Sequence, residues 1–301
     1  MSRKLVHPNE WRSAVITAAD CGENHVGNEQ IGKKKKGFNL NDLKVINHFG
    51  FENKGKIIEL HNQPIDGLPE AYVLHVKKGL EVSTWANSDA LWNEIKAMGN
   101  EQTDDKYLCT RRKKVLQKHK RRNTIYADFN QEPDYALGKG RIHAFETKPV
   151  ANSIRKGMNS IPIQHLNDSI FELNIYDHEK ARIGWHGDTE RNQVFGINVG
   201  EDRFIRFQWY LRNKPVGDMV TIPIKHGDCY VMDFKSTGND WKMSSIYTLR
   251  HCAGNKTACD IMDKERSKKL EKRKRKSETK LAGNSTKKQL TLKEIVNLSS
   301  M

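Results

Sequence analysis

The chain has 301 residues, a formal net charge of +15 at neutral pH and a hydrophobic fraction of 36%. A mean hydropathy of -0.78 and a charged fraction of 30% predict one catalytic-sized core with solvated extensions. No run approaches the roughly 20 apolar residues of a membrane-spanning helix, and the N-terminus lacks the apolar stretch of a signal peptide, so we expect a soluble, intracellular protein. The five cysteines show no paired spacing, which favours reduced thiols and indicates neither zinc nor disulfides.

The first 105 residues predict a mixed α/β region. Residues 70–80 alternate like a strand that ends in a turn, and residues 87–99 combine a polar cap, apolar residues at helical spacing and a terminal glycine. The Gly-bracketed stretch GENHVG at 22–27 suits either a functional loop or a plain turn. We therefore expect residues 1–105 to form an N-terminal α/β region whose role the sequence does not define.

A strongly basic run follows at residues 111–122, with eight Lys or Arg in twelve positions. Its composition predicts an exposed helix or loop with side chains outside the core. Nucleic acid is the commonest partner of a soluble basic protein, and phosphate neutralisation would give the run affinity without sequence preference. We expect this run to lead into a domain over residues 106–263.

From Asn123 onward, short apolar segments alternate with turn residues, as in FELNIY, RIGWH, VFGINV and FIRFQWYL. Repeated short strands at such spacing favour an antiparallel barrel or jelly roll. The predicted fold class is α+β, with a double-stranded β-helix (jelly-roll) core.

The segment RIGWHGDTE at 182–190 carries the clearest chemistry. Side chains two apart on a strand point the same way, so His186 and Asp188 can face one cavity. A distant histidine would complete a facial triad of two histidines and a carboxylate, which suits iron(II) and leaves positions open on the metal. The candidates are His226, in a turn, and His251, which ends a strand where a jelly roll would return beside the first two ligands. We favour His251.

Three ordered blocks of this region resemble the AlkB family of oxygenases: NIYDHEKARIGWHGDTE, VFGINVGEDRFIRFQ and KHGDCYVMDFKSTGNDW. In that family Asn-x-Tyr on one strand precedes His-x-Asp by about a dozen residues. The likeness covers roughly residues 125–255. The whole chain also resembles uncharacterised oxygenase-like proteins of large DNA viruses and some microbes, a likeness that brings no established substrate.

The AlkB resemblance implies an Fe(II)- and 2-oxoglutarate-dependent dioxygenase. The resemblance implies that His186, Asp188 and His251 would hold iron. It also implies that Asn174 and Tyr176 would contact 2-oxoglutarate and that Glu190 would contact the substrate base.

The chain departs from the family pattern after the distal histidine, where AlkB-like proteins carry a further strand with an Arg that grips the cosubstrate's far carboxylate. No Arg stands between His251 and Arg266. In a rival register the segment SIYTLR is that last strand, and the iron-binding histidine would fall near Met243 and be missing. Arg250 is the anchor candidate under both registers.

The predicted reaction is oxidative demethylation or hydroxylation of nucleic acid, DNA or RNA. A base in a duplex must be flipped out to reach the metal, and Trp185, Trp209 or Tyr210 could stack on it. One alternative is an oxygenase acting on protein side chains or free nucleotides. Another is a non-enzymatic nucleic-acid-binding protein on a degenerate oxygenase fold, which is favoured if His251 does not converge on His186.

Residues 264–301 hold 13 Lys or Arg against 4 Asp or Glu. Few apolar residues offset the entropy of ordering them, so we expect a basic, mostly disordered tail, with at most an isolated helix, that acts as a tether or nuclear import signal. The segment QLTLKEIV at 289–296 partly matches a sliding-clamp-binding peptide, but Ile295 and Val296 stand where aromatics are wanted. A short amphipathic helix is the alternative there.

Overall fold

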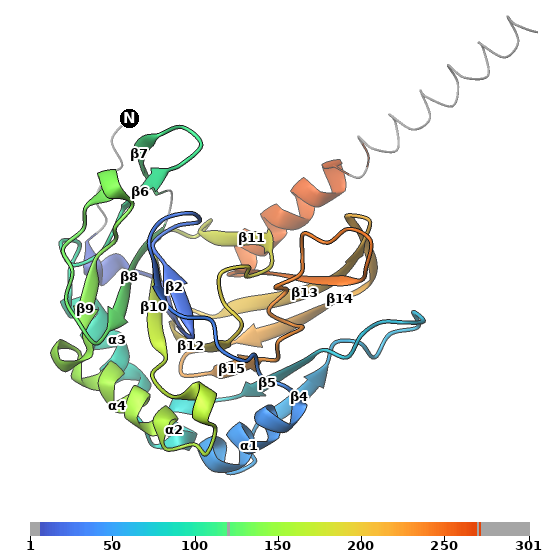
Figure 1. Cartoon of the computed structure of the whole chain (residues 1–301), viewed down its shortest axis with the longest axis horizontal. Coiled ribbons are helices and arrows are strands. Elements are labelled where there is room, and N and C mark those ends of the chain that lie inside the picture. The colour runs from blue at the N-terminus through green and yellow to red at the C-terminus, as the bar shows by residue number, and fades with distance from the viewer. Residues whose placement is uncertain (1–6, 119–120, 270, 272–301) are drawn as a thin grey trace, which may run out of the picture. The chain divides into compact units, whose positions relative to one another are not determined.

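The computed structural model describes residues 7–118, 121–269 and 271. It divides the chain into a compact unit over Met1–Ala258 and a second unit over Cys259–Met301. The fold is mixed α+β, and its regular structure is mostly sheet, with one eight-stranded and one four-stranded sheet in the part described (Figure 1).

The eight-stranded sheet unites strands from almost the whole first unit. In spatial order these are β4 (Lys56–Glu59), β5 (Tyr72–Val76), β15 (Cys229–Met232), β12 (Val194–Gly200), β1 (Ser13–Ala19), β10 (Ile170–Tyr176), β8 (Arg121–Ala127) and β9 (Ile142–Ala144). β1 lies in the middle and is antiparallel to both β10 and β12. Its residues are therefore hydrogen-bonded to partners more than 150 positions away.

The four-stranded sheet has the order β11 (Arg182–His186), β16 (Thr248–Gly254), β13 (Arg203–Leu211) and β14 (Lys214–Ile224). Two small hairpins complete the strands: β2 (Cys21–Glu23) with β3 (Gln30–Gly32), and β6 (Lys106–Cys109) with β7 (Lys114–Gln117).

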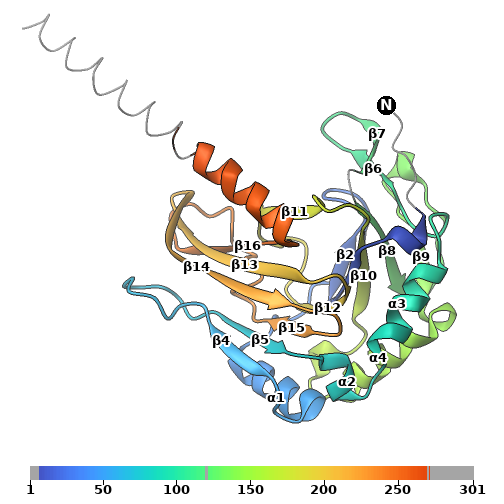
Figure 2. The ribbon, with the colours of Figure 1, turned by 180° about the vertical axis from the view of Figure 1, so that it is seen from behind.

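Four α-helices lie along the outer face of the large sheet (Figures 1 and 2): α1 (Leu40–Phe51), α2 (Gly79–Ser83), α3 (Ser88–Ala97) and α4 (Pro149–Asn159). Four short 3-10 helices lie at Pro8–Glu10, Tyr135–Leu137, Phe145–Thr147 and Gln164–Leu166. α1 begins where it does because Asn39 and Asp42 cap each other's backbone N–H groups.

Alternation along the strands builds two apolar layers. On β5, Leu74 joins the cluster that packs against the helices, whereas Val73 joins a second cluster with Phe207 and Trp209 of the four-stranded sheet. The large sheet is thus buried on both faces, and the space between the two sheets is partly core and partly the cavity described below.

The predicted helix at 87–99 is confirmed as α3, capped by the side chain of Asn87. The predicted strand at 70–80 is confirmed as β5, which ends in the predicted turn at residues 77–78 before the short helix α2 begins. The expected boundary at residue 105 is wrong, because β1, β4 and β5 share a sheet with β10, β12 and β15.

The basic run at 111–122 is neither a helix nor a plain loop. It covers the turn and second strand of the β6–β7 hairpin and the start of β8. Residues 111–115 are exposed as expected, but Lys118 and Arg122 are only 4% and 3% exposed. Arg122 is buried because its guanidinium donates to the Thr103 Oγ1 at 2.6 Å and to the carbonyl oxygens of Asn100 and Thr103 at 2.6 and 3.1 Å.

Among the described residues no helix is both long and apolar enough to cross a bilayer. Residues 256–269 are helical, which includes the first six positions of the predicted tail. Residues 270 and 272–301, including the sliding-clamp-like segment, lie outside the described residues.

Candidate metal centre and cavity

Three side chains converge where β11 and β16 pair. His186 ends β11 and lies directly opposite His251 of β16 in the register, with ring centroids 4.4 Å apart. Asp188 follows two residues after His186, and its Oδ1 lies 3.4 Å from His186 Nε2 and 3.8 Å from His251 Nε2. The predicted convergence of these three residues is therefore observed.

The turn after β11 aims Asp188 at the two histidines. The Asp188 backbone N–H donates to the Thr237 carbonyl at 2.9 Å, and the Asn239 side-chain amide donates to the Asp188 carbonyl at 3.3 Å. Gly187 allows this close approach, since a Cβ at that position would lie 2.1 Å from the Gly238 carbonyl oxygen and 2.7 Å from the Trp241 ring. The Gly in His-Gly-Asp is a packing requirement.

Both histidines can offer a ring nitrogen to a metal. His186 Nδ1 lies 2.7 Å from the Gly184 carbonyl oxygen, which only accepts, so Nδ1 carries a proton and Nε2, which faces Asp188, is the nitrogen that a metal would bind. Burial, with the nearby charge of His186, lowers the pKa of His251 to about 4. His251 is therefore neutral at neutral pH.

Asp188 is the anionic member of the group. Burial alone would raise its pKa, but His251, His186 and Arg191 together hold the pKa of this carboxyl well below its usual range. Burial opposes protonation of His186, yet the hydrogen bond to Asp188 raises the His186 pKa above its ordinary value. A metal would compete with that proton.

The donor set fits a divalent transition-metal ion. The ligating atoms of His186, Asp188 and His251 all lie within 4.8 Å of one another. An ion about 2 Å from each ligand needs facial ligand atoms roughly 3 Å apart, so side-chain shifts of about an ångström close the site. Two imidazoles and one carboxylate form a facial set with positions left open.

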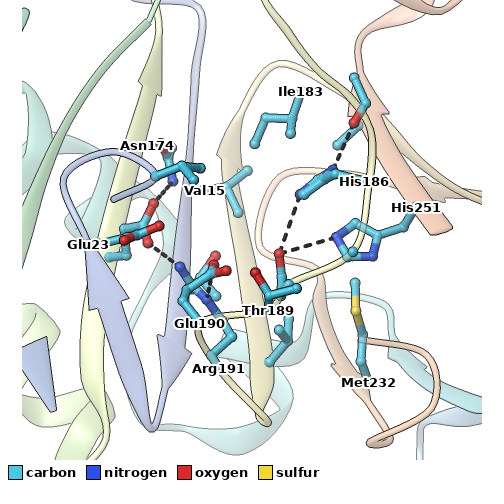
Figure 3. A pocket seen from close by; sticks show the side chains of 18 of the residues that line it. Val15, Glu23, Asn174, Ile183, His186, Thr189, Glu190, Arg191, Met232 and His251 are labelled. Atoms are coloured by element: carbon cyan, nitrogen blue, oxygen red, sulfur yellow. Dashed lines mark hydrogen bonds and ion pairs between the residues drawn. The ribbon is translucent and has the colours of Figure 1, made fainter. Parts of the chain in front are cut away.

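The metal group forms one wall of a cavity of about 430 Å³ between the two sheets. Figure 3 shows His186 and His251 on one side of this cavity and a polar wall facing them, whose labelled members include Glu23, Asn174, Glu190 and Arg191. Its volume is ample for a small organic acid together with part of a larger substrate.

Arg191 organises the polar wall. Its guanidinium pairs with Glu172 and lies 3.0 Å from Glu190 Oε1. Burial raises the pKa of Glu190 despite this partner, and burial together with Glu190 raises the pKa of Glu23 to about 7. Glu190 lines the cavity as predicted, but it is paired with Arg191.

Asn174 and Tyr176 both line the cavity, as the alternation of β10 predicts. The Asn174 amide donates to Glu172 Oε1 at 2.9 Å, and its Oδ1 accepts from Arg121 at 3.3 Å. Both residues therefore face the same cavity as the metal group.

Arg250 does not lie in the cavity, and the expectation that it anchors a ligand there is corrected. It precedes His251 on β16 and therefore points to the opposite face, where its guanidinium stacks over Tyr210 and Trp241 and donates to Asn213 Oδ1 at 2.6 Å. The rival histidine His226 is also elsewhere, with Nε2 3.3 Å from Asp89.

Several cavity residues were missed from the sequence. The stretch GENHVG supplies Glu23, Asn24, His25 and Val26 to the lining, and Arg121 comes from the basic run. The Gly-bracketed polarity of that stretch was the available signal, but its position beside the metal centre follows from the pairing of β1, which no local pattern shows.

Fold and site define an α+β protein with a three-residue site suited to a metal ion in the wall of a cavity. No known family model matches the chain. It is 38% identical over 249 residues to an uncharacterised protein of Acanthamoeba polyphaga mimivirus, covering 80% of this chain and 94% of the relative. The chain belongs to the family of that viral protein.

Proposed function

We propose that this protein is an Fe(II)- and 2-oxoglutarate-dependent dioxygenase acting on nucleic acid. The observation that carries the proposal is the convergence of His186, Asp188 and His251 on one point of the cavity wall. The alternative of a degenerate, non-enzymatic fold is favoured if His251 points away from His186, but their ring centroids are 4.4 Å apart.

The arrangement of strands also supports an oxygenase of the jelly-roll kind. The order β11-β16-β13-β14 faces β15-β12-β1-β10 across the cavity, which gives two opposed four-stranded layers. In the AlkB-like pattern the closing strand follows the distal histidine. Here the chain becomes helical from residue 256, and β1 fills the place between β10 and β12.

The protein's own residues would position the reactants. His186, Asp188 and His251 would hold iron, and Asn174 with Tyr176 would contact 2-oxoglutarate beside it. When bound, the metal and cosubstrate would supply oxidative attack on an unreactive C–H bond. The apolar lining from Val15, Ile183, Ile205 and Met232 would exclude water from that bond.

A nucleic-acid substrate is supported by what borders the cavity. Loop 22–28, which comprises the end of β2 and most of the turn that leads to β3, contributes the lining residue His25. The His25 ring centroid lies 3.7 Å from that of Tyr107 in the β6–β7 hairpin. Asn28 of this loop also exchanges two hydrogen bonds with the Leu108 backbone, at 2.9 and 3.1 Å. The exposed charges of the hairpin, Arg111 to Lys114, are thus held beside the residues that line the cavity.

Aromatic side chains for base stacking are available in the cavity lining. Trp185 and Trp241 both line it. Of the three aromatics expected to stack, Trp209 is fully buried and donates to the Leu60 carbonyl at 2.8 Å, so it is a core residue. A flipped base would therefore meet Trp185 or Trp241.

The test is 2-oxoglutarate turnover, followed as succinate, with and without methylated oligonucleotides. We expect iron-dependent turnover that methylated oligonucleotides stimulate, and Asp188→Ala should abolish it while leaving the far-UV circular dichroism spectrum unchanged. His226→Ala is the matched control, since His226 lies outside the metal group. Retained turnover in Asp188→Ala would refute the site, and stimulation by methylated peptides or nucleotides alone would redirect the substrate assignment.

A further inference from the structure

A buried arginine lies beside the cavity where β1, β10 and β13 meet. Arg203, the first residue of β13, is 4% exposed, and its guanidinium carbon lies 3.5 Å from the centre of the Tyr176 ring. Its Nη1 lies 3.4 Å from the Oγ of Ser13, the β1 residue paired with Tyr176 in the register. Tyr176 itself lines the cavity.

The direction of Arg203 follows from strand alternation. Ile205 is two residues further along β13 and lines the cavity, so the two side chains leave the same face of the strand. Tyr230, which also lines the cavity, interacts electrostatically with Arg203. Burial raises the Tyr230 pKa, and the charge of Arg203 opposes that rise. Arg203 therefore faces the space between the sheets.

We propose that Arg203 anchors the far carboxylate of 2-oxoglutarate, with Ser13 and Tyr176 beside it. This inference rests on the proposed function. A guanidinium presents parallel N–H donors that match a carboxylate, and their attraction is stronger in a buried site than in water. Stacking on Tyr176 fixes the plane of the guanidinium in advance.

The route of the chain explains why the anchor would come from β13. The family pattern places an Arg on a strand after the distal histidine, but here the closing position belongs to β1, whose sequence SAVITAA holds no basic residue. Ser13 is small, which leaves room for a guanidinium arriving from β13. The cation that would bind the far carboxylate thus comes from β13 and not from the closing strand.

Arg121 is the competing cation. It lines the cavity directly but is half-buried and belongs to β8, one strand beyond β10. Burial and the charge of Arg121 lower the pKa of His25 to about 4, which places this guanidinium close to loop 22–28. Arg121 lies on the loop side of Asn174, and Arg203 lies at Tyr176.

The experiment compares two ligands that differ only in the far carboxylate: 2-oxoglutarate and 2-oxopentanoate. Isothermal titration calorimetry on Mn(II)-loaded full-length protein measures both. Arg203→Met should weaken 2-oxoglutarate binding about 10- to 100-fold and leave 2-oxopentanoate binding unchanged. Arg203→Lys should recover part of the loss, and the matched control Arg206→Met, on the opposite face of β13, should change neither affinity. Arg121→Met tests the competing cation and should cause no loss that is selective for 2-oxoglutarate.

Equal weakening of both ligands by Arg203→Met would show a merely structural role and overturn the proposal, as would a selective loss in Arg121→Met. If circular dichroism shows that Arg203→Met is unfolded, Arg203→Gln removes the charge with less loss of polar contacts and decides the question in its place. Failure of the wild-type protein to bind 2-oxoglutarate with Mn(II) would instead refute the proposed function itself.

Discussion

At the scale of single residues, Gly187 tests whether the metal group needs its observed geometry. We expect Gly187→Ala to lower metal affinity about 10- to 100-fold, as loss of a supporting contact around a metal site does, because the new methyl would meet the Gly238 carbonyl oxygen at 2.1 Å. The measurement is Mn(II) or Fe(II) affinity by calorimetry under anaerobic conditions.

Gly184→Ala is the matched control for that change. Nothing lies within 4 Å of a Cβ at Gly184, and its carbonyl, which holds His186 Nδ1, is retained. We expect affinity close to that of the wild type. If both variants bound metal equally well, close packing at Gly187 would be irrelevant to the site.

Lys118 links loop 22–28 to the start of β8, since its ammonium donates to the Asn24 carbonyl at 3.1 Å and to the side chains of Asn24 and Asn123. Burial and the charge of Arg121 lower the pKa of Lys118 from 10.5 to about 7. At pH values between about 7 and 10.5, the Lys118 side chain is protonated in the unfolded chain and mostly neutral in the folded protein. The contribution of Lys118 to the free energy of unfolding therefore rises with pH.

We accordingly expect the free energy of unfolding of the wild type, relative to Lys118→Met, to increase from pH 7 to about pH 10. Urea denaturation of both proteins across this range measures the difference and cancels the titration of other groups. A difference that stays flat or declines with pH would mean that Lys118 is charged in the folded protein.

The sequence predicted the residues whose spacing itself carries the geometry. His186 and Asp188 are two apart at a strand end, and His251 ends up opposite His186 because β16 pairs with β11. Arg191 was not predicted as a cavity residue, because a buried arginine cannot be told from surface charge in a chain with 52 Lys and Arg. Burial is a tertiary property that residue type alone does not reveal.

At the scale of elements, we expect the β6–β7 hairpin to bind the phosphates of a nucleic acid. Changing Arg111, Arg112, Lys113 and Lys114 to Ala should weaken oligonucleotide binding and flatten its salt dependence, since each lost phosphate contact removes about 0.7 to 0.9 from the slope of log K against log salt. Fluorescence anisotropy at several salt concentrations measures the slope.

The control removes the same number of charges from elsewhere. Lys44, Lys56, Lys77 and Lys214 are exposed and lie on or beside elements other than the hairpin. Their change to Ala should leave most of the slope intact. Equal slopes in the two quadruple variants would make the hairpin an ordinary solvated surface and attribute affinity to net charge alone.

Local sequence patterns predicted most of the helices and strands correctly, but they did not predict which strands pair with each other. Short apolar segments between turn residues predicted β10 and β12 as strands, and a polar cap with apolar residues at helical spacing predicted α3. The pairing of β1 with both β10 and β12 joins residue 13 to residues 176 and 200. Such long-range pairing leaves no periodic signal, so the N-terminal region was assigned to a separate domain.

At the scale of the whole molecule, three strands of that N-terminal region complete the large sheet. Without β1 the edges of β10 and β12 would expose unpaired backbone groups in the interior, and without β5 the strand β15 would lose one of its two neighbours. Buried backbone groups without partners are costly. Residues 106–263 therefore contain the metal ligands and the four-stranded sheet that carries two of them, but lack three strands of the large sheet opposite.

We expect the fragment 106–263 to be unfolded or aggregated and unable to bind Mn(II), whereas a chain ending at residue 271 should keep the thermal midpoint of the full-length protein. Circular dichroism melting and amide hydrogen exchange compare the two. The shorter chain also tests the charge of the C-terminal segment, whose 272–301 portion includes the LysArgLysArgLys cluster at 272–276. Its removal should spare 2-oxoglutarate binding and weaken affinity for long nucleic acid at low salt. A cooperative melt of fragment 106–263 would show that the fold forms without β1, β4 and β5, and would contradict the structural role assigned to these strands.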